Sequence, residues 1–462
     1  MLDKTILLQE LNDFNPWWKG SFPTEGRLYH RHGFASLLKL LPLEPIVAVT
    51  GLRRTGKTTL LFQLLHHLIE HEKISPQRIC RYQFEERLIP PTDRDLDLII
   101  RTFLESILNE DIHTTKRTFF FFDELQFVEG WQAVLKKYYD LNKHLKFFVS
   151  GSSSLFLRKA TRESLAGRVF EEMISPLSFR EYLEMTGQFQ DDMPHTQFSF
   201  NELDDKLFET YRQMFSLHQE KREKAFTTFM VRGQFPEAVS FPDSSLVFRY
   251  LRESVITKII EYDLPKLYGF RKSGELATLL FSLAKETGNI LEYSNLAAEI
   301  GISLLTIKEY ISAFKDSYLL DLLFSYTKKH RRGPRQLKKG YIVSPNFTCA
   351  LHGMNEFNLI NNPVMGHLVE TEVFNHLRQH HPISFWNSKG KEVDFLLSLQ
   401  KELLPIEVKY TNRLRKEDLA DTLFLMKKKK LSAGLVITKH IFDSVTVDGK
   451  RLYMIPAWIV MM

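Results

Sequence analysis

The stretch GLRRTGKTT, which begins at Gly51, has the residue types and spacing of a phosphate-binding loop. It satisfies G-x-x-x-x-G-K-[ST], follows a short apolar run and opens an amphipathic segment, as the mechanism of such a loop requires. Gly51 and Gly56 let backbone N–H groups face phosphates, with a helix N-terminus behind them. We expect Lys57 to reach the β- and γ-phosphates, Thr58 to bind Mg²⁺ and Thr59 to contact the α-phosphate. A glycine-rich turn before a helix is the alternative interpretation.

A second acidic motif, FFFFDE, ends at Glu124 after an apolar run. In this position Asp123 is expected to hold Mg²⁺ through water, and Glu124 to polarise the attacking water. A P-loop kinase would not need the second acid, so Glu124 favours ATP hydrolysis. Without the phosphate-binding loop, the same two acids could simply cap a strand.

Three further features could belong to a nucleotide site, each with a simpler alternative. Ser150 or Ser152, in FVSGSSS, could sense the γ-phosphate, or could form an ordinary serine-rich turn. Arg168 could reach a γ-phosphate in trans as an arginine finger, or could be a surface arginine. Trp17 or Trp18 could stack on adenine, although core packing is the favoured interpretation for both.

A separate set of charged residues occurs in KEVDFLLSLQKELLPIEVKYT, residues 391–411. If the two apolar runs pair as a hairpin, Asp394 and Glu407 lie on one side, because strand side chains alternate. Two carboxylates there could bind Mg²⁺, with Glu370 from an upstream helix as a further acid. Lys409 could orient or deprotonate water during phosphodiester cleavage. The alternative is that these charged side chains simply face water.

The elements that must position the first set are strands alternating with helices. Four short apolar runs predict buried strands of a parallel sheet: 45–50, 78–84, 117–124 and 144–154. Amphipathic helical patterns occupy the intervals between them, and this alternation predicts βαβ units and a doubly wound sheet. The fold class expected for the chain is therefore α/β.

The middle of the chain has helical patterns followed by a basic segment. Residues 176–265 are mostly helical, and the spacing around Gly301 predicts a helix-turn-helix with Ser303 as an N-cap. Ile307, Ile311 and Phe314 follow at helical spacing and should pack inward. The segment KKHRRGPRQLKK (328–339) carries seven Lys/Arg in twelve residues and could contact DNA phosphates, or could simply be solvated.

From residue 340 onward the pattern is again α/β. A strand leads to a helix from about Gly366 to His380, then to the hairpin described above, a helix and a last strand pair.

Length and composition limit the protein class. The 462 residues suffice for two or three domains, and no apolar run approaches the ~18 residues that span a bilayer. Cys80 and Cys349 are too few for a disulfide framework, and the N-terminus has no signal-peptide pattern, so a reducing cytoplasm is expected. Residues 264–462 carry 28 Lys/Arg against 19 Asp/Glu, which favours a polyanionic partner such as DNA.

The chain resembles the archaeal-type AAA ATPases of bacteria and archaea. The resemblance rests on the motifs NPWW, GLRRTGKTT, FFFFDE, SGSSS, LAGR, PLSFREYL, EVDFLL and PIEVKY, in this order. It implies an AAA+ P-loop core that binds and hydrolyses ATP, a winged-helix region and a C-terminal domain similar to PD-(D/E)xK nucleases. For that last domain it implies the set Glu370, Asp394, Glu407 and Lys409. Thr371 departs from the pattern, because relatives often have asparagine there.

Together these observations predict five regions: an N-terminal segment (1–44), an ATPase core (45–175), a helical lid or linker (176–265), a winged helix (266–340) and a nuclease-like domain (341–462). The expected function is Mg²⁺-dependent ATP hydrolysis coupled to a C-terminal domain that binds DNA and could cleave it. The alternative is an ATP-dependent signalling switch that binds proteins, its own copies included, with an inactive nuclease-like scaffold. A standalone P-loop kinase or GTPase is disfavoured, because the chain lacks an Asn-Lys-x-Asp guanine motif.

Overall fold

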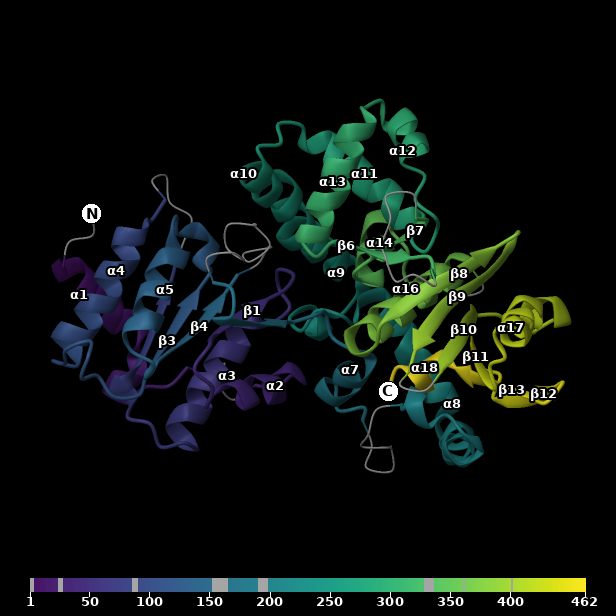
Figure 1. Cartoon of the computed structure of the whole chain (residues 1–462), viewed down its shortest axis with the longest axis horizontal. Coiled ribbons are helices and arrows are strands. Elements are labelled where there is room, and N and C mark those ends of the chain that lie inside the picture. Colours follow the sequence, from purple (N-terminus) through teal and green to yellow (C-terminus); the bar gives the residue numbers. More distant parts are fainter. Residues whose placement is uncertain are drawn as a thin grey trace. The chain divides into compact units, whose positions relative to one another are not determined.

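The computed structural model describes residues 4–23, 28–84, 90–151, 165–189, 198–327, 336–359, 362–399 and 402–462 (Figure 1). The chain forms two compact units. The first comprises Met1–Ser175 and Asp316–Tyr318, and the second comprises Pro176–Lys315 and Leu319–Met462.

The first unit is built on a five-stranded parallel sheet of order β2-β3-β4-β1-β5. Its strands are β1 (Ile46–Thr50), β2 (Ile79–Gln83), β3 (Thr118–Asp123), β4 (Leu145–Ser150) and β5 (Val169–Met173). The four predicted strands are confirmed, with ends shifted by one residue in most cases. The last three residues of the predicted run 144–154 lie outside the described residues. The fifth strand was not predicted, because its sequence VFEEM lies at an edge and leaves several side chains exposed.

Helices cover both faces of this sheet, as the alternating pattern predicts. They are α1 (Lys4–Phe14), α2 (Gly33–Leu40), α3 (Lys57–Glu70), α4 (Asp93–Thr102) and α5 (Trp131–Leu141). Side chains of alternate residues along each strand point to opposite faces of the sheet and pack into two separate hydrophobic cores. Phe120 and Phe147 pack with side chains of α1, α4 and α5, whereas Phe121 and Phe148 pack with side chains of α2 and α3. The strands are therefore apolar on both sides.

The second unit begins with helices and a short hairpin. The helices are α7 (Phe179–Met185), α8 (Asp205–Arg232), α9 (Ser244–Tyr250), α10 (Leu264–Tyr268), α11 (Ser273–Lys285), α12 (Tyr293–Ile300) and α13 (Leu304–Asp316). The strands β6 (Leu320–Phe324) and β7 (Lys338–Ile342) then pair antiparallel. The predicted turn is confirmed: Gly301 ends α12 with φ 78°, and Ser303 Oγ accepts from Thr306 N–H at 3.1 Å. Ile307, Ile311 and Phe314 are buried, as predicted.

The C-terminal part of this unit contains a mixed sheet of order β12-β13-β11-β10-β9-β8. Its strands are β8 (Ile383–Ser388), β9 (Lys391–Ser398), β10 (Leu403–Lys409), β11 (Ala433–Thr438), β12 (Asp443–Val447) and β13 (Lys450–Pro456). The helices are α14 (Pro345–His352), α15 (Glu356–Leu359), α16 (Val364–His380), α17 (Lys416–Lys429) and α18 (Ala457–Val460). The predicted hairpin is confirmed as β9 and β10, but β8 extends it, and three strands follow α17 where the sequence predicted two.

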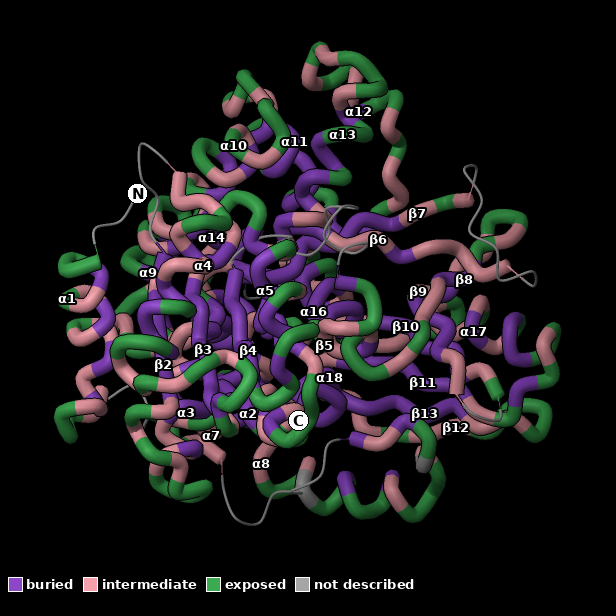
Figure 2. Tube along the Cα trace, turned by 60° about the vertical axis from the view of Figure 1, so that its left-hand side comes forward, coloured by how far each residue is buried: buried purple, intermediate pink, exposed green. Residues whose placement is uncertain are grey.

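Buried residues are concentrated in the strands of both sheets (Figure 2). Among the helices that the structure describes, none is long and apolar enough to cross a membrane.

Candidate nucleotide site and carboxylate cluster

The phosphate-binding loop lies between the carboxyl end of β1 and the first turn of α3. Gly51 has φ 130°, and a Cβ there would lie 2.3 Å from the carbonyl oxygen of Ile174, so only glycine fits. Gly56 has φ 92° and precedes the helix. Arg31 donates to the carbonyl oxygen of Thr55 at 2.7 Å. A side chain distant in sequence thus fixes the loop backbone. The strand–loop–helix context predicted from the sequence is present.

Lys57 is buried and directed back over its own loop. Its Nζ donates to the carbonyl oxygens of Gly51 at 3.1 Å and Leu52 at 2.8 Å. An ammonium in this position can exchange carbonyl oxygens for phosphate oxygens without a large movement of its backbone. Thr58 and Thr59 lie in the first helical turn and are partly exposed.

The acidic motif and Ser150 meet at the carboxyl edge of the sheet. Strand order places β4 between β1 and β3, so Ser150 at the end of β4 lies beside Asp123 at the end of β3. Ser150 Oγ donates to Asp123 Oδ1 and accepts from the N–H of Glu124 at 3.2 Å. Ser150 therefore links the metal-binding and water-activating candidates. Ser152 lies outside the described residues.

Arg81 is a partner of Asp123 that sequence reasoning missed. Its guanidinium lies 3.2 Å from Asp123 Oδ2, and both side chains are almost fully buried. The guanidinium also lies 4.4 Å from the ring centroid of Phe62. The available signal was an arginine inside the apolar strand ICRYQ, because a buried arginine requires a charged or hydrogen-bonded partner. Glu124 has φ 55° and accepts from the side-chain amide of Gln126.

Arg168 and the two tryptophans lie away from this edge. The carbonyl oxygen of Arg168 accepts from Ile46 N–H at 2.8 Å, at the start of β1, and its side chain pairs with Asp140 at 3.0 Å. Since Gly51 follows the other end of β1, Arg168 cannot act on the phosphates of its own chain in this structure. Trp17 and Trp18 both donate to the carbonyl oxygen of Ile79, at the start of β2, which agrees with packing and not with adenine stacking.

In the second unit, the hairpin brings the predicted acidic residues together. Pairing of Ile406 with Phe395 puts Glu407 opposite Asp394. The N–H of Asp394 donates to Glu407 Oε2 at 3.4 Å, and the N–H of Val408 donates to Asp394 Oδ2 at 2.9 Å. Lys409 Nζ lies 2.7 Å from Glu407 Oε1. The charged side chains are thus mostly buried and paired, and the interpretation that they simply face water is wrong.

A second lysine, Lys339 of β7, lies at the centre of this carboxylate cluster. Its Nζ is 2.7 Å from Glu392 Oε1, 3.2 Å from Glu370 Oε1 and 3.5 Å from Asp394 Oδ1. The hydroxyl of Tyr341 donates to Glu370 Oε1 at 2.7 Å. We call the set of Lys339, Glu370, Glu392, Asp394, Glu407 and Lys409 the carboxylate cluster.

Sequence reasoning missed Lys339, Tyr341 and Glu392. The signal that could have found them is alternation: Lys339 and Tyr341 share one face of β7, and Glu392 and Asp394 share one face of β9. Lys339 had been grouped with the basic segment expected to contact DNA. Because its side chain is only 5 % exposed, Lys339 cannot make that contact in this structure. Residues 328–335 of the segment lie outside the described residues.

Burial and mutual repulsion determine the protonation of the cluster. Burial, and then the neighbouring Asp394 charge, raise the pKa of Glu370 to about 7. The same two causes raise the pKa of Glu407 to about 8. Burial lowers the pKa of both lysines, but the neighbouring carboxylates together outweigh it and raise the pKa: Glu407, Asp394 and Asp418 for Lys409, and Glu370, Asp394 and Glu392 for Lys339. Both lysines are therefore charged at neutral pH.

The cluster does not have the geometry of a metal site in its present arrangement. Within the described ranges, no group of three or more His, Cys, Asp or Glu side chains is arranged to hold a metal ion. The ammonium of Lys339 lies where the carboxylates of Glu370 and Asp394 converge. Nothing in the structure tests metal binding by Glu370, Asp394 and Glu407 directly, and it stays a prediction.

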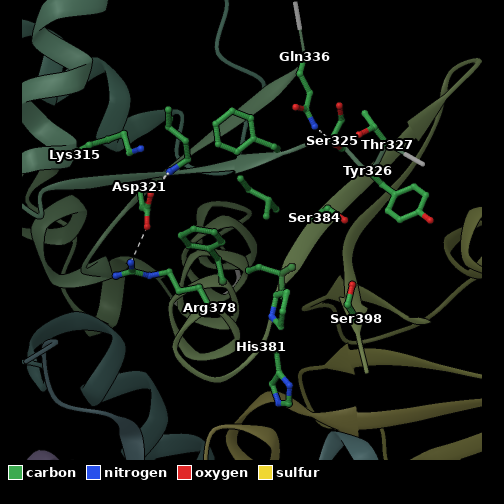
Figure 3. A pocket seen from close by; sticks show the side chains of 16 residues that line it. Lys315, Asp321, Ser325, Tyr326, Thr327, Gln336, Arg378, His381, Ser384 and Ser398 are labelled. Carbon is green, nitrogen blue, oxygen red and sulfur yellow. Dashed lines mark hydrogen bonds and ion pairs between the residues drawn. The ribbon is translucent and has the colours of Figure 1, made fainter. Parts of the chain in front are cut away.

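A pocket of about 410 Å³ lies elsewhere in the second unit (Figure 3). Residues of β6, the end of α16 and the start of β8 line it. Its one carboxylate, Asp321, pairs with Arg378 at 2.8 Å. None of the carboxylate-cluster residues lines it, so the pocket is separate from the candidate site.

Three family models match successive parts of the chain. Residues 43–183 match an AAA domain, residues 223–358 match a domain of unknown function (DUF8612), and residues 365–458 match a domain of unknown function (DUF4143). Lys339 lies in the second match and its carboxylate partners lie in the third. The chain therefore carries an AAA-type ATPase domain, a class of domain that binds ATP, usually with Mg²⁺.

Similar chains occur in an archaeon and a bacterium. "Uncharacterized protein MJ1544" of Methanocaldococcus jannaschii is 27% identical over 91% of this chain and 89% of its own. An "Uncharacterized protein" of Haemophilus influenzae is 22% identical over 92% of this chain and 96% of its own.

Two solved structures show a weaker likeness. The Walker-type ATPase PABY2304 of Pyrococcus abyssi has a TM-score of 0.36 and 16% identity, over 72% of this chain and 97% of its own. The Orc1 protein of Aeropyrum pernix in complex with DNA has a TM-score of 0.29 and 12% identity, over 71% and 93%. Likeness at this level carries no conclusion about function.

Proposed function

We propose that this protein hydrolyses ATP with Mg²⁺ in its first unit and uses the cycle as a switch for its second unit. The observation that carries the proposal is the junction of Asp123, Glu124 and Ser150 on the same sheet edge as the phosphate-binding loop. Through its backbone N–H, Glu124 is held next to Asp123, and a site that only binds nucleotide does not need a second acid there.

The roles follow from the residue chemistry. Backbone N–H groups from Gly51 to Thr59 and the Lys57 ammonium bind the phosphates. The hydroxyl of Thr58 and the carboxylate of Asp123 are oxygen donors of the kind that Mg²⁺ prefers, and Mg²⁺ would neutralise phosphate charge. Glu124 orients and polarises the attacking water.

Ser150 gives the site a means of responding to the γ-phosphate. Its Oγ already bridges Asp123 and the N–H of Glu124, so a change in one of these two hydrogen bonds alters the other.

The test is ATP turnover and ATP binding by Glu124→Gln beside wild type. We expect turnover to fall by about 10²–10³-fold with nucleotide binding retained, because glutamine keeps the shape but cannot polarise water. Glu129→Gln changes an exposed glutamate nearby and serves as the matched control. Normal turnover by Glu124→Gln would contradict the assignment.

We further propose DNA as a partner of the second unit. Support comes from the order of α11, α12, α13, β6 and β7, three helices followed by a hairpin, which is that of a winged helix, and from the basic excess of residues 264–462. Phosphate contacts would make binding weaken steeply with salt. The test replaces all five Lys/Arg residues of 328–335 by Gln and measures DNA binding at several salt concentrations. Loss of salt-sensitive binding is the expected result.

A protein-binding switch with an inactive nuclease-like scaffold is the second candidate. The contacts of Lys339 with Glu370, Glu392 and Asp394 favour it, since these acids already have a cationic partner. Mg²⁺- or Mn²⁺-dependent cleavage of linear, single-stranded, supercoiled and branched DNA, with Glu407→Ala alongside, separates the two. Cleavage lost in Glu407→Ala would establish a nuclease, whereas no cleavage with normal ATP turnover would favour the scaffold.

A further inference from the structure

The ammonium of Lys339 has the surroundings that proteins commonly give to a bound cation. Its side chain is only 5 % exposed, and its Nζ contacts carboxylates from two different elements, Glu370 of α16 and both Glu392 and Asp394 of β9. An ammonium has three N–H donors, and three carboxylate oxygens lie within 3.5 Å.

We infer that Lys339 is a built-in cation that takes the place of a divalent metal ion in the carboxylate cluster, so that the C-terminal domain is held together without metal. Mg²⁺ needs oxygen ligands at about 2.0–2.1 Å in octahedral geometry. An ammonium that contacts Glu370 and Asp394 at 3.2 and 3.5 Å occupies the space between them and repels a second cation.

The other donors in the cluster give the remaining carboxyl oxygens partners. Lys409 pairs with Glu407 at 2.7 Å, and backbone N–H groups donate to Asp394 and Glu407. The hydroxyl of Tyr341 donates to Glu370. Each of these three carboxylates therefore has a donor supplied by the protein, and none depends on a metal ion for a partner.

The position of Lys339 is fixed by the strand in which it lies. It lies in β7, paired with Leu323 of β6, and its side chain is enclosed near the ring of Phe385. The ion pairs thereby fasten the β6–β7 hairpin to α16 and β9. In sequence terms they join the segment matched at 223–358 to the one matched at 365–458.

The test measures Mn²⁺ binding to the full-length, nucleotide-free protein by electron paramagnetic resonance. Lys339→Met keeps the length of the side chain and removes the charge, and Lys338→Met, whose side chain lies over the rings of Tyr293 and Phe324, is the matched control. Asp123→Asn in every background reports any binding at the nucleotide site. This test does not depend on ATP hydrolysis.

We expect wild type and Lys338→Met to show no Mn²⁺ binding that depends on the cluster. Lys339→Met should gain one site at least tenfold tighter than any in wild type, and Asp394→Asn should remove that gain. Wild-type Mn²⁺ binding that survives Asp123→Asn but is lost in Asp394→Asn would overturn the inference. A folded Lys339→Met that gains no site would also overturn it.

Circular dichroism determines whether Lys339→Met folds. If it does not fold, a comparison of wild type with Asp394→Asn still decides. If Lys339 fills the cluster, added Mn²⁺ should shift the thermal unfolding temperature of wild type no more than that of Asp394→Asn. A metal-dependent difference in wild type that Asp394→Asn abolishes would contradict the inference.

Discussion

The nucleotide site and the carboxylate cluster both place buried carboxylates beside a basic side chain, but they differ in what else surrounds the charge. At Asp123, one cation, Arg81, lies 3.2 Å away on one side, and the glycine-rich loop lies along the same sheet edge. At Glu370, Glu392 and Asp394, one ammonium is shared among three acids and is itself buried.

This difference separates a site prepared for a ligand from one whose acids already have partners within the protein. The phosphate-binding loop has backbone groups and a lysine whose present partners are carbonyl oxygens, which a phosphate can replace. The carboxylate cluster has ion pairs that share one buried ammonium, and removing a buried partner from such a pair leaves an uncompensated charge at a cost of several kcal/mol. Similar residue types therefore support binding in one region and cohesion in the other.

The largest effect that tests the comparison is expected at Lys57. Lys57→Met should lower ATP turnover by at least about 10²-fold, because no other side chain replaces its contact with the phosphates. Lys19→Met, at an exposed lysine, is the control. Turnover by Lys57→Met within a factor of three of wild type would mean that the loop does not carry catalysis.

The next effect concerns Glu372, a buried acid of α16 that accepts from the Gln234 side-chain amide at 2.6 Å. Burial raises its pKa to about 7. Between its ordinary pKa and about 7 the unfolded chain releases this proton while the folded chain keeps it, so folded-state stability should fall as the pH rises through this window.

Glu372→Gln should remove that loss. Relative to wild type, its free energy of unfolding should increase by on the order of 2 kcal/mol between pH 4.5 and pH 8, measured by urea unfolding. Glu417→Gln, at an exposed acid of α17, is the control and should show no such trend. A pH-independent difference for Glu372→Gln would show that this acid is ionised in the folded chain throughout.

A smaller effect is expected at Ser150. Ser150→Ala removes the hydroxyl that joins Asp123 to the N–H of Glu124, and we expect kcat for ATP to fall about tenfold with KM nearly unchanged. Steady-state kinetics beside Ser75→Ala, at an exposed serine, measure this. A rise in KM alone would instead assign Ser150 to binding.

The smallest effect is expected at Arg168 in dilute protein. Arg168→Ala should leave turnover unchanged there, because Arg168 lies at the sheet edge opposite the loop of its own chain. If Arg168 acts in trans, turnover by wild type, but not by the variant, should rise with protein concentration. A loss that is independent of concentration would contradict action in trans.

Much of the ATPase core could be predicted from local patterns. The runs that became β1, β2 and β3 are apolar on both faces because helices cover both sides, and such runs are recognisable without any tertiary information. The edge strand β5 was missed because two adjacent glutamates interrupt its apolar run and three of its five residues are exposed. In the hairpin, strand alternation correctly predicted that Asp394 and Glu407 share one side.

The partners of these acids could not be predicted in this way. Lys339 is 31 residues from Glu370 and lies in a stretch whose composition favours contact with nucleic acid. Arg81 and Asp123 are 42 residues apart, and β2 and β3 must pair in parallel before they meet. Composition describes the charge of a segment but not which of its side chains the fold encloses.

The sequence by itself determined the phosphate-binding loop, the acidic motif after β3 and the alternation of strands and helices, because each depends on residues close together in the chain. Tertiary structure alone decided that Ser150 joins Asp123 to Glu124, that Arg168 lies at the opposite edge, and that Lys339 lies among three carboxylates. These outcomes depend on strand order and on the pairing of distant elements, and the pairwise energy of buried charges is realised only when the fold has removed them from water.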